Sequence, residues 1–376
     1  MTAVVGLMFV GLQQGFGYSP WRGTPEPVSY GTQHDDRHSW WWWRKWHRPR
    51  PTTGPPTSTT ATTTPAPTTT TQPPAPTTTT TTPPPPTSTS NPAPPVPPGA
   101  LPPNTVPQPG QVGFRGDPAT LRVIDGSASG LPAGARWSAG ALRITGNVTL
   151  DGVFVKGGIQ LSGGSLTLTN SIVEGTPSLW ATILASRGTV LEVRDSTLRW
   201  KAGAGPPGSN WGNGVIHGDA RMTIVRNDLS GSPDGIQFAS SDSVFEQNWI
   251  HDLAMFGDTH NDGVQSYGGD NNVFRYNRID LRDAQGRAYN GHQNGALFFQ
   301  PSSGFPLRNV QIVGNWLSGG GFTLRLEAPV TGAVVTGNQF GPYTGGWGDV
   351  LVDDSGVSIA QWSGNLDNGG RTIPAP

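Results

Sequence analysis

The chain has 376 residues with 53 glycines, 37 prolines and no cysteine, and only 34% of its residues are hydrophobic and 13% charged. Because ordinary globular proteins are nearer half apolar and a quarter charged, part of this chain is expected to lack a packed core. The absence of cysteine excludes disulfides, thiol catalysis and cysteine-ligated zinc. The formal net charge of −1 gives no sign of the basic surface that nucleic-acid binding requires.

Residues 1–50 form a first segment with two distinct features. An apolar run at residues 3–12 has the length of a signal-peptide core and is too short to span a bilayer. Residues 40–46 combine tryptophan with arginine and lysine, a composition suited to contact with a membrane surface or a cell-wall polymer. A plain junction before the next segment is the alternative interpretation of this cluster.

Residues 51–110 are expected to be a disordered linker. Of residues 51–100, 17 are proline and 20 are threonine, and none is charged. Such a segment cannot bury enough apolar surface to offset the entropy of ordering, so we expect an extended spacer. Threonine- and proline-rich stalks commonly hold a domain away from a surface. The linker therefore predicts an extracellular or cell-surface protein, without a transmembrane segment.

The remaining domain, residues 111–376, holds 44 of the 53 glycines and contains a sequence repeat. An apolar residue, two variable residues, a small polar residue, one further residue and a second apolar residue recur, as in Ile224-Val-Arg-Asn227-Asp-Leu229. The small polar position is filled by Ser171, Ser196, Asn227, Asn248, Asn277, Asn315, Asn338 and Asn365. Short strands with steps of 21 to 38 residues predict a right-handed parallel β-helix in which the asparagines form a structural ladder.

A second repeat, aspartate or asparagine followed by glycine, precedes the ladder positions. Its members are Asn213-Gly214, Asp234-Gly235, Asp262-Gly263 and Asn294-Gly295. The next ladder asparagine follows 13 or 14 residues after the first three glycines, so this half of each coil is nearly constant. Most insertions fall in the other half, at residues 197–212, 249–261 and 280–293. We expect them to form walls beside one corner of the coil.

Polar side chains of this second repeat are predicted to gather on one patch, because adjacent rungs bring equivalent side chains about 4.8 Å apart. The expected rows are Asn213, Asp234, Asp262 and Asn294, then His260 and His292, then Gln237 and Gln265. The walls add Lys201, Trp211 and Asp258. His217 alternates with Val215 and is expected inside the coil.

These residues offer acid–base chemistry. Two neighbouring carboxylates cannot both ionise freely, so the pKa of one rises and that group can serve as an acid. Asp262 and Asp234 are therefore candidates for acid–base catalysis or calcium coordination. His260 and His292 are candidate proton carriers, and Arg325 can pair with a uronate carboxylate. No cofactor is required for this chemistry, and calcium is an option.

The arrangement resembles the pectin-lyase-like superfamily over residues 140–370. Four segments are similar to polygalacturonase elements: Ser232-Pro-Asp234-Gly to N-T-D-G, Asn261-Asp262 to the paired aspartates, Gly291-His292-Gln to G-H-G, and Leu324-Arg325-Leu to R-I-K. The general acid of that family is the first aspartate of the pair, which is Asn261 here, and its lysine is Leu326. Asp258-Thr-His260 is similar to the D-P-H motif of mannuronan epimerases, which share the fold with pectate lyases.

The sequence therefore predicts an all-β extracellular enzyme that cleaves or modifies an acidic polysaccharide, as a lyase or a glycoside hydrolase. The substrate would be bound by Asp258, Asn261, Gln237, Gln265, Asn294, Trp211 and Lys201. One alternative is a non-catalytic glycan-binding or adhesion module, including a tailspike-like receptor binder. Another is a structural spacer, in which the Asp-Gly units are ordinary capped turns and Arg325 is a salt-bridge partner.

Overall fold

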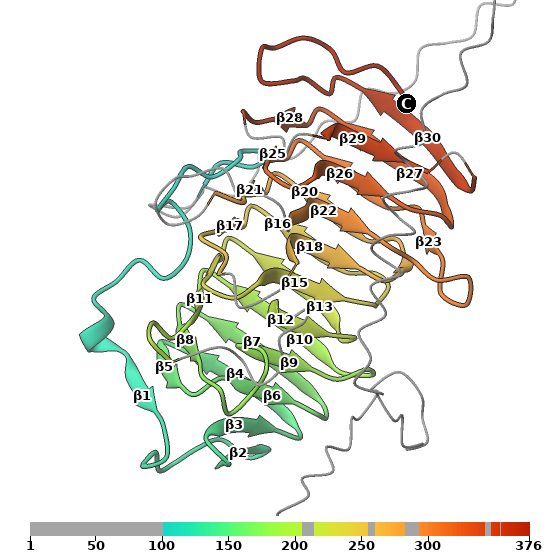
Figure 1. Ribbon diagram of the computed structural model, residues 1–376. Coiled ribbons are helices and arrows are strands. Elements are labelled where there is room, and N and C mark those ends of the chain that lie inside the picture. The colour runs from blue at the N-terminus through green and yellow to red at the C-terminus, as the bar shows by residue number, and fades with distance from the viewer. Residues whose placement is uncertain (1–100, 205–213, 255–259, 283–292, 343–346, 354) are drawn as a thin grey trace, which may run out of the picture. The chain divides into compact units, whose positions relative to one another are not determined.

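The computed structural model describes residues 101–376 except 205–213, 255–259, 283–292, 343–346 and 354. These residues form a parallel β-helix, and the prediction of an all-β solenoid is confirmed (Figure 1). The only helical element in the described part is a 3-10 turn, η1 (Pro118–Thr120). Nothing in the described part is a helix long and apolar enough to cross a membrane.

Three sheets run along the helix, and each coil contributes strands to them in turn. Sheet 1 contains β2 (Ala135–Ser138), β3 (Ala141–Ile144), β6 (Ile159–Leu161), β9 (Ile183–Ala185), β12 (Gly214–Gly218), β15 (Asp234–Phe238), β18 (Asn261–Ser266), β22 (Gln293–Phe299), β26 (Phe322–Leu326) and β29 (Gly348–Val352). Sheet 2 contains β4 (Asn147–Asp151), β7 (Ser165–Thr169), β10 (Val190–Arg194), β13 (Arg221–Val225), β16 (Val244–Glu246), β20 (Val273–Arg275), β24 (Gln311–Val313), β27 (Val330–Thr336), β23 (Leu307–Arg308), β19 (Gly269–Asp270) and β30 (Val357–Ser363). Sheet 3 contains β1 (Arg122–Ile124), β5 (Val153–Lys156), β8 (Ile172–Gly175), β11 (Thr197–Trp200), β14 (Asp228–Ser230), β17 (Trp249–His251), β21 (Arg278–Asp280), β25 (Trp316–Ser318) and β28 (Gln339–Phe340).

Inward-facing side chains of the three sheets stack into one continuous core. Aromatic rings occupy its middle rungs, where the ring centroids of Phe245 and Phe274 are 4.8 Å apart with a 7° interplanar angle. Phe238 and Phe299 pack against this pair at 4.9 Å from Phe245 and 5.3 Å from Phe274. Each fully buried phenylalanine stabilises the fold by about 1.5–3 kcal/mol. The rungs are therefore held by side-chain stacking as well as by strand pairing.

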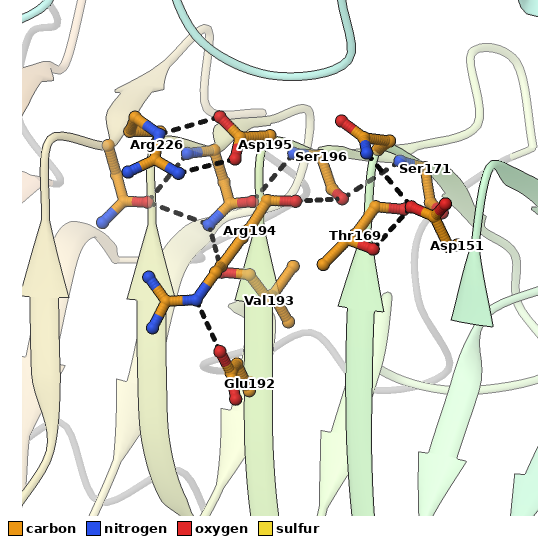
Figure 2. Close-up of polar contacts among 12 residues, drawn as sticks. Asp151, Thr169, Ser171, Glu192, Val193, Arg194, Asp195, Ser196 and Arg226 are labelled. Atoms are coloured by element: carbon orange, nitrogen blue, oxygen red, sulfur yellow. Dashed lines mark hydrogen bonds and ion pairs between the residues drawn. The ribbon is translucent and has the colours of Figure 1, made fainter. Parts of the chain in front are cut away.

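The predicted ladder is confirmed at the turn between sheets 2 and 3. The amide of Ser171 donates to Oγ of Ser196 at 3.1 Å, and the amide of Ser196 donates to Oδ1 of Asn227 at 3.0 Å (Figure 2). The same step repeats through the later asparagines up to Asn365. The residue before each ladder position is left-handed, for example Arg226 with φ +54°. This turn keeps the ladder side chain buried while its neighbours vary.

Residues 101–113 lie against the outside of the β-helix. The first ten of them belong to the segment that the composition predicts to be linker. Nε2 of Gln247 donates to the carbonyl oxygens of Pro102 and Thr105 at 2.9 and 3.0 Å. Further along, the amide of Gly113 donates to the carbonyl of Arg226 at 3.0 Å. A Cβ at Gly113 would lie 2.6 Å from Cβ of Asp228. The chain thus crosses the edge of sheet 3 before it enters the first coil at β1.

Candidate functional site

The outer face of sheet 1 carries a column of mostly polar side chains on five successive rungs. Strand register aligns His217, Gln237, Gln265, Phe298 and Arg325. Each of these residues is at most 8% exposed. Two of them, Gln237 and Gln265, were predicted to stack, and the structure places them side by side. The column runs across successive rungs, parallel to the helix axis.

Asp234 and Asp262 lie at the start of β15 and β18, beside this column. Oδ1 of Asp234 accepts the backbone amide of Asp262 at 2.8 Å. Oδ1 of Asp262 accepts the amide of Gly295 at 2.9 Å, and its Oδ2 accepts Nδ2 of Asn294 at 3.1 Å. The expected row of Asp234, Asp262 and Asn294 is therefore present, whereas Asn213 lies outside the described residues.

Glycine follows each of these aspartates because the backbone at that position lies against a core isoleucine and leaves no room for a side chain. A Cβ at Gly235 would lie 2.5 Å from Cγ2 of Ile250, and one at Gly263 would lie 2.3 Å from Cγ2 of Ile279. The register also shifts between Asn261 and Asp262, which marks a bulge. The Asp-Gly pattern is thus a local packing requirement that also fixes where each carboxyl group sits.

Burial makes both carboxyl groups hard to ionise. Asp234 is 0% exposed and Asp262 is 1% exposed. Desolvation, followed by the charge of Asp262, raises the pKa of Asp234 well above its usual value. Desolvation raises the pKa of Asp262 to about 7, although hydrogen bonds from Asn294 and Gly295 oppose the shift. Oδ2 of Asp234 has no hydrogen-bond partner among the described residues.

Tyr267 is a member of this site that the sequence did not reveal. Nε2 of Gln237 donates to Oε1 of Gln265 at 2.7 Å and also approaches the Tyr267 hydroxyl at 2.8 Å. The hydroxyl in turn donates to Oε1 of Gln265 at 3.0 Å. Burial raises the pKa of Tyr267, so the phenol stays protonated. Its place two residues after Gln265, just past the end of β18, was the available signal.

Glu327 is the second member that sequence reasoning missed. Its Oε1 forms an ion pair with Nη2 of Arg325, and both side chains are nearly buried. The Arg325 guanidinium also lies 4.6 Å from the ring centroid of Phe298. The charge of Arg325 lowers the pKa of Asp262 and the charge of Glu327 raises it, so this pair is electrostatically coupled to the aspartates. Glu327 is two residues beyond Arg325, again the signal for a shared strand face.

The expectation that His217 faces the inside of the coil is wrong. Register pairs Ile216 with the core residue Ile236, and His217 with the outer-face residue Gln237. The His217 ring packs on Trp180 with ring centroids 4.2 Å apart at 58°. Val215 and Ile216 are both in the core, so simple alternation fails at the start of β12. An aromatic pair therefore lies at the β12 rung of the outer column.

The remaining predicted residues are not all brought into the column. His260 is exposed just before β18, and Lys201 is exposed just after β11. Asn261 is buried, and its Nδ2 donates to the carbonyls of Pro233 and Ala254 at 2.6 and 2.9 Å, so it ties the adjoining loop to the coil. Trp211, Asp258 and His292 lie outside the described residues.

The residues that the structure describes contain no group of three or more histidine, aspartate or glutamate side chains placed to hold a metal ion. The carboxyl groups of Asp234 and Asp262 instead bond to backbone amides of the next rung.

Folding stability should depend on pH through Asp262. Its pKa is 3.8 when unperturbed and about 7 in the folded chain, so the folded state binds the proton more tightly than the unfolded state. This contribution is fully present below about pH 4 and is lost as pH rises to about 7. We expect the free energy of unfolding of the Asp262→Asn variant to fall less than that of the parent as pH rises between these values, as measured by chemical unfolding. If variant and parent differed by the same free energy at every pH, the assignment would be contradicted.

Comparison with known proteins gives one match. The model of a family described as "Right handed beta helix region" matches residues 137–365, which is more than half of the chain. No curated protein and no solved structure matches the chain. The matched range contains every candidate residue discussed above.

Proposed function

Because the chain belongs to the right-handed β-helix family, we propose that it is an extracellular enzyme that cleaves an acidic polysaccharide at the outer face of sheet 1. The proposal assigns acid–base roles to Asp234 and Asp262, and carboxylate binding to Arg325. It assigns contacts with sugar hydroxyls to Gln237, Gln265, Asn294 and Tyr267.

The observation that supports this proposal best is the carboxyl group of Asp234. It is fully buried, its pKa is raised, and its Oδ2 lacks a partner among the described residues. The asparagine ladder shows how this fold satisfies a side chain that serves structure alone, because each amide group both donates and accepts there. A carboxyl group whose burial favours the protonated form, with one oxygen free of other bonds, suits a general acid.

The second carboxyl group completes the acid–base pair. With a pKa of about 7, Asp262 is partly ionised at neutral pH and can accept a proton from water. In hydrolysis, Asp234 would protonate the glycosidic oxygen as the C–O bond breaks, and water would attack the anomeric carbon while Asp262 takes its proton. In elimination, a base would instead remove the proton on the carbon beside the uronate carboxylate. The bond from the adjacent ring carbon to the glycosidic oxygen would break, Asp234 would protonate the departing oxygen, and an unsaturated sugar end would remain.

Arg325 supports an acidic substrate rather than a neutral one. Within the described residues, the Arg325 side chain pairs with Glu327 and lies over the Phe298 ring. A guanidinium can take a carboxylate with two parallel hydrogen bonds. A uronate group reaching this rung would share Arg325 with Glu327, and its charge would also act on Asp262.

A non-catalytic glycan-binding or adhesion module is the second candidate function. It is favoured by the burial of Asp234 and Asp262 and by their bonds to the backbone of the next rung. Those bonds are what a structural ladder would also use. The two functions differ in whether binding is followed by a chemical change in the glycan.

The test incubates the full chain with polygalacturonate, alginate and other uronate-containing polymers. Reducing ends and the absorbance of unsaturated sugars are followed together, and NMR of the polymer detects epimerisation. We expect new reducing ends on at least one polymer. Added absorbance would identify elimination, and its absence would identify hydrolysis. Retained binding without any product across the panel would overturn the enzyme in favour of the binding module.

A further inference from the structure

A second column of side chains lies on the outer face of sheet 3. Strand register places Trp249, Arg278 and Trp316 on three successive rungs of β17, β21 and β25. All three side chains are half-buried. The two tryptophans are two rungs apart, about 9.6 Å, which is close to the length of a disaccharide in an extended glycan.

The arginine in this column is held by an aromatic ring rather than by an acid. Its guanidinium carbon lies 3.9 Å from the ring centroid of Trp316. Its side chain has no hydrogen bond or ion pair with another described residue, and its Nε is buried without an acceptor. Partial burial lowers the pKa of Arg278, which is the cost of desolvating an unpaired cation.

The carboxylates around this column already have partners. Asp228 and Asp252 contact the two ring nitrogens of His251 at 3.0 and 2.8 Å. Asp280 accepts the guanidinium of Arg282 through both oxygens. Asp280 acts on Arg278 only through its charge, and the charge of Arg282 opposes it. Among the described residues, Arg278 is therefore the cation in this cluster without an acidic partner.

Trp249 is held in place on the other side of the arginine. Its ring stacks on the His251 ring with centroids 3.4 Å apart and an 11° interplanar angle. His251 is in turn fixed by its two carboxylates, which raise its pKa against the effect of burial. A preorganised indole loses little freedom on binding. The column thus offers two aromatic surfaces with a planar cation between them.

We propose that Trp249, Arg278 and Trp316 form a binding site for a uronate-containing oligosaccharide, separate from the site on sheet 1. The guanidinium would hold a sugar carboxylate through two parallel hydrogen bonds. The C–H faces of the flanking sugars would pack on the indoles. The acidic glycan as ligand rests on the proposed function, whereas the position of the site rests on the sheet 3 geometry alone. Such a site would keep the enzyme on a polymer that it processes on another face.

The test measures binding of oligogalacturonate and oligoalginate to the full chain by calorimetry, with carboxyl-reduced neutral counterparts as reference ligands. Arg278→Gln removes the positive charge and the parallel N–H donors of the guanidinium. Arg199→Gln is the matched control, because it removes the same charge from the same sheet where Arg199 is paired with Glu174. We expect Arg278→Gln to weaken one class of sites at least about tenfold, and Arg199→Gln to bind like the parent. Trp316→Ala should weaken the same class.

The outcomes separate this inference from the proposed function. Binding that depends on Arg278 in a chain that cleaves nothing would support the sheet 3 site and reject the enzyme. Cleavage combined with equal binding by the Arg278→Gln and Arg199→Gln variants would reject the sheet 3 site and keep the enzyme. Equal affinity for the acidic and neutral oligosaccharides would also reject the site. Thermal unfolding of each variant checks that lost binding is not lost folding.

Discussion

Replacing Asp234 by asparagine is expected to lower the rate of polysaccharide cleavage by about 10²- to 10⁴-fold, the usual contribution of a general acid or base. The amide oxygen of asparagine can still accept the backbone N–H of Asp262, which now bonds to Oδ1 at 2.8 Å. The coil should therefore remain intact while the proton donor is lost. The measurement is the initial rate of reducing-end formation on the polymer that the parent cleaves best.

A matched control is available on the same sheet. Asp219 directly follows β12, is 8% exposed, and burial raises its pKa to about 6. Its Oδ2 pairs with Arg187 at 3.4 Å, and the Asp219–Arg187 ion pair has no counterpart at Asp234 among the described residues. Asp219→Asn should leave the rate within a few-fold of the parent, because the proposal gives no role in the reaction to this similarly buried acid. Equal rate losses in the Asp219 and Asp234 variants would mean that general destabilisation is being measured.

Asp262 provides an independent test of the same pair. Asp262→Asn keeps an oxygen for the amide of Gly295 but loses the group that accepts the proton from water. Undiminished cleavage by this variant would reject the site on sheet 1. The pH profile is informative too, because activity that requires Asp262 ionised should fall as the pH drops below the Asp262 pKa of about 7.

Replacing Asn277 by alanine is expected to cost about 3–5 kcal/mol of unfolding free energy. The amide and Nδ2 of Asn248 donate to Oδ1 of Asn277 at 3.0 and 2.9 Å. Nδ2 of Asn277 donates to the carbonyl of Phe245 and to Oδ1 of Asn315, both at 2.9 Å. Nδ2 of Asn248 keeps the carbonyl of Ile224, and Oδ1 of Asn315 keeps the backbone amide of residue 277. The amide of Asn248 and the carbonyl of Phe245 lose their bonds to the side chain of residue 277, and each orphaned buried group costs roughly 1–3 kcal/mol. Denaturant unfolding of the full chain measures the loss.

The control for the ladder is an asparagine on the surface. Asn147 in β4 is exposed and accepts one hydrogen bond, from Oγ of Ser165 at 3.1 Å. Asn147→Ala should change the unfolding free energy by less than about 0.5 kcal/mol. Similar losses at Asn147 and Asn277 would mean that the buried ladder contributes no more to stability than surface polar contacts do.

Part of the candidate site was predictable because it obeys the same rule as the ladder. Each rung of a parallel β-helix presents the same backbone groups at the same place, so the same residue type recurs wherever it satisfies them. Asp234 and Asp262 recur with a glycine because each must accept the amide of the next rung while the following residue touches the core. A repeat in the sequence records this requirement directly.

Other members of the site could not be predicted from the repeat. Tyr267 and Glu327 occur once each, and their roles depend on which side chains of adjacent strands meet them. His217 faces outward because alternation fails at the start of β12, where Val215 and Ile216 both enter the core. The sequence does not distinguish Arg278 from other arginines in strands, because its lack of an acidic partner among the described residues depends on which groups the surrounding carboxylates bind.

The sequence alone determined the linker composition, the repeat, the β-helix and the ladder, because these follow from local patterns that recur at every coil. Only the tertiary structure decided which chemistry-bearing side chains share a surface. Coil lengths vary from 21 to 38 residues, so residues that meet on one face are separated by irregular stretches of chain. Burial, which raises the pKa of Asp234 and Asp262, is likewise a property of the packed rungs rather than of any single segment. The same holds for Arg278, which has no acidic partner among the described residues.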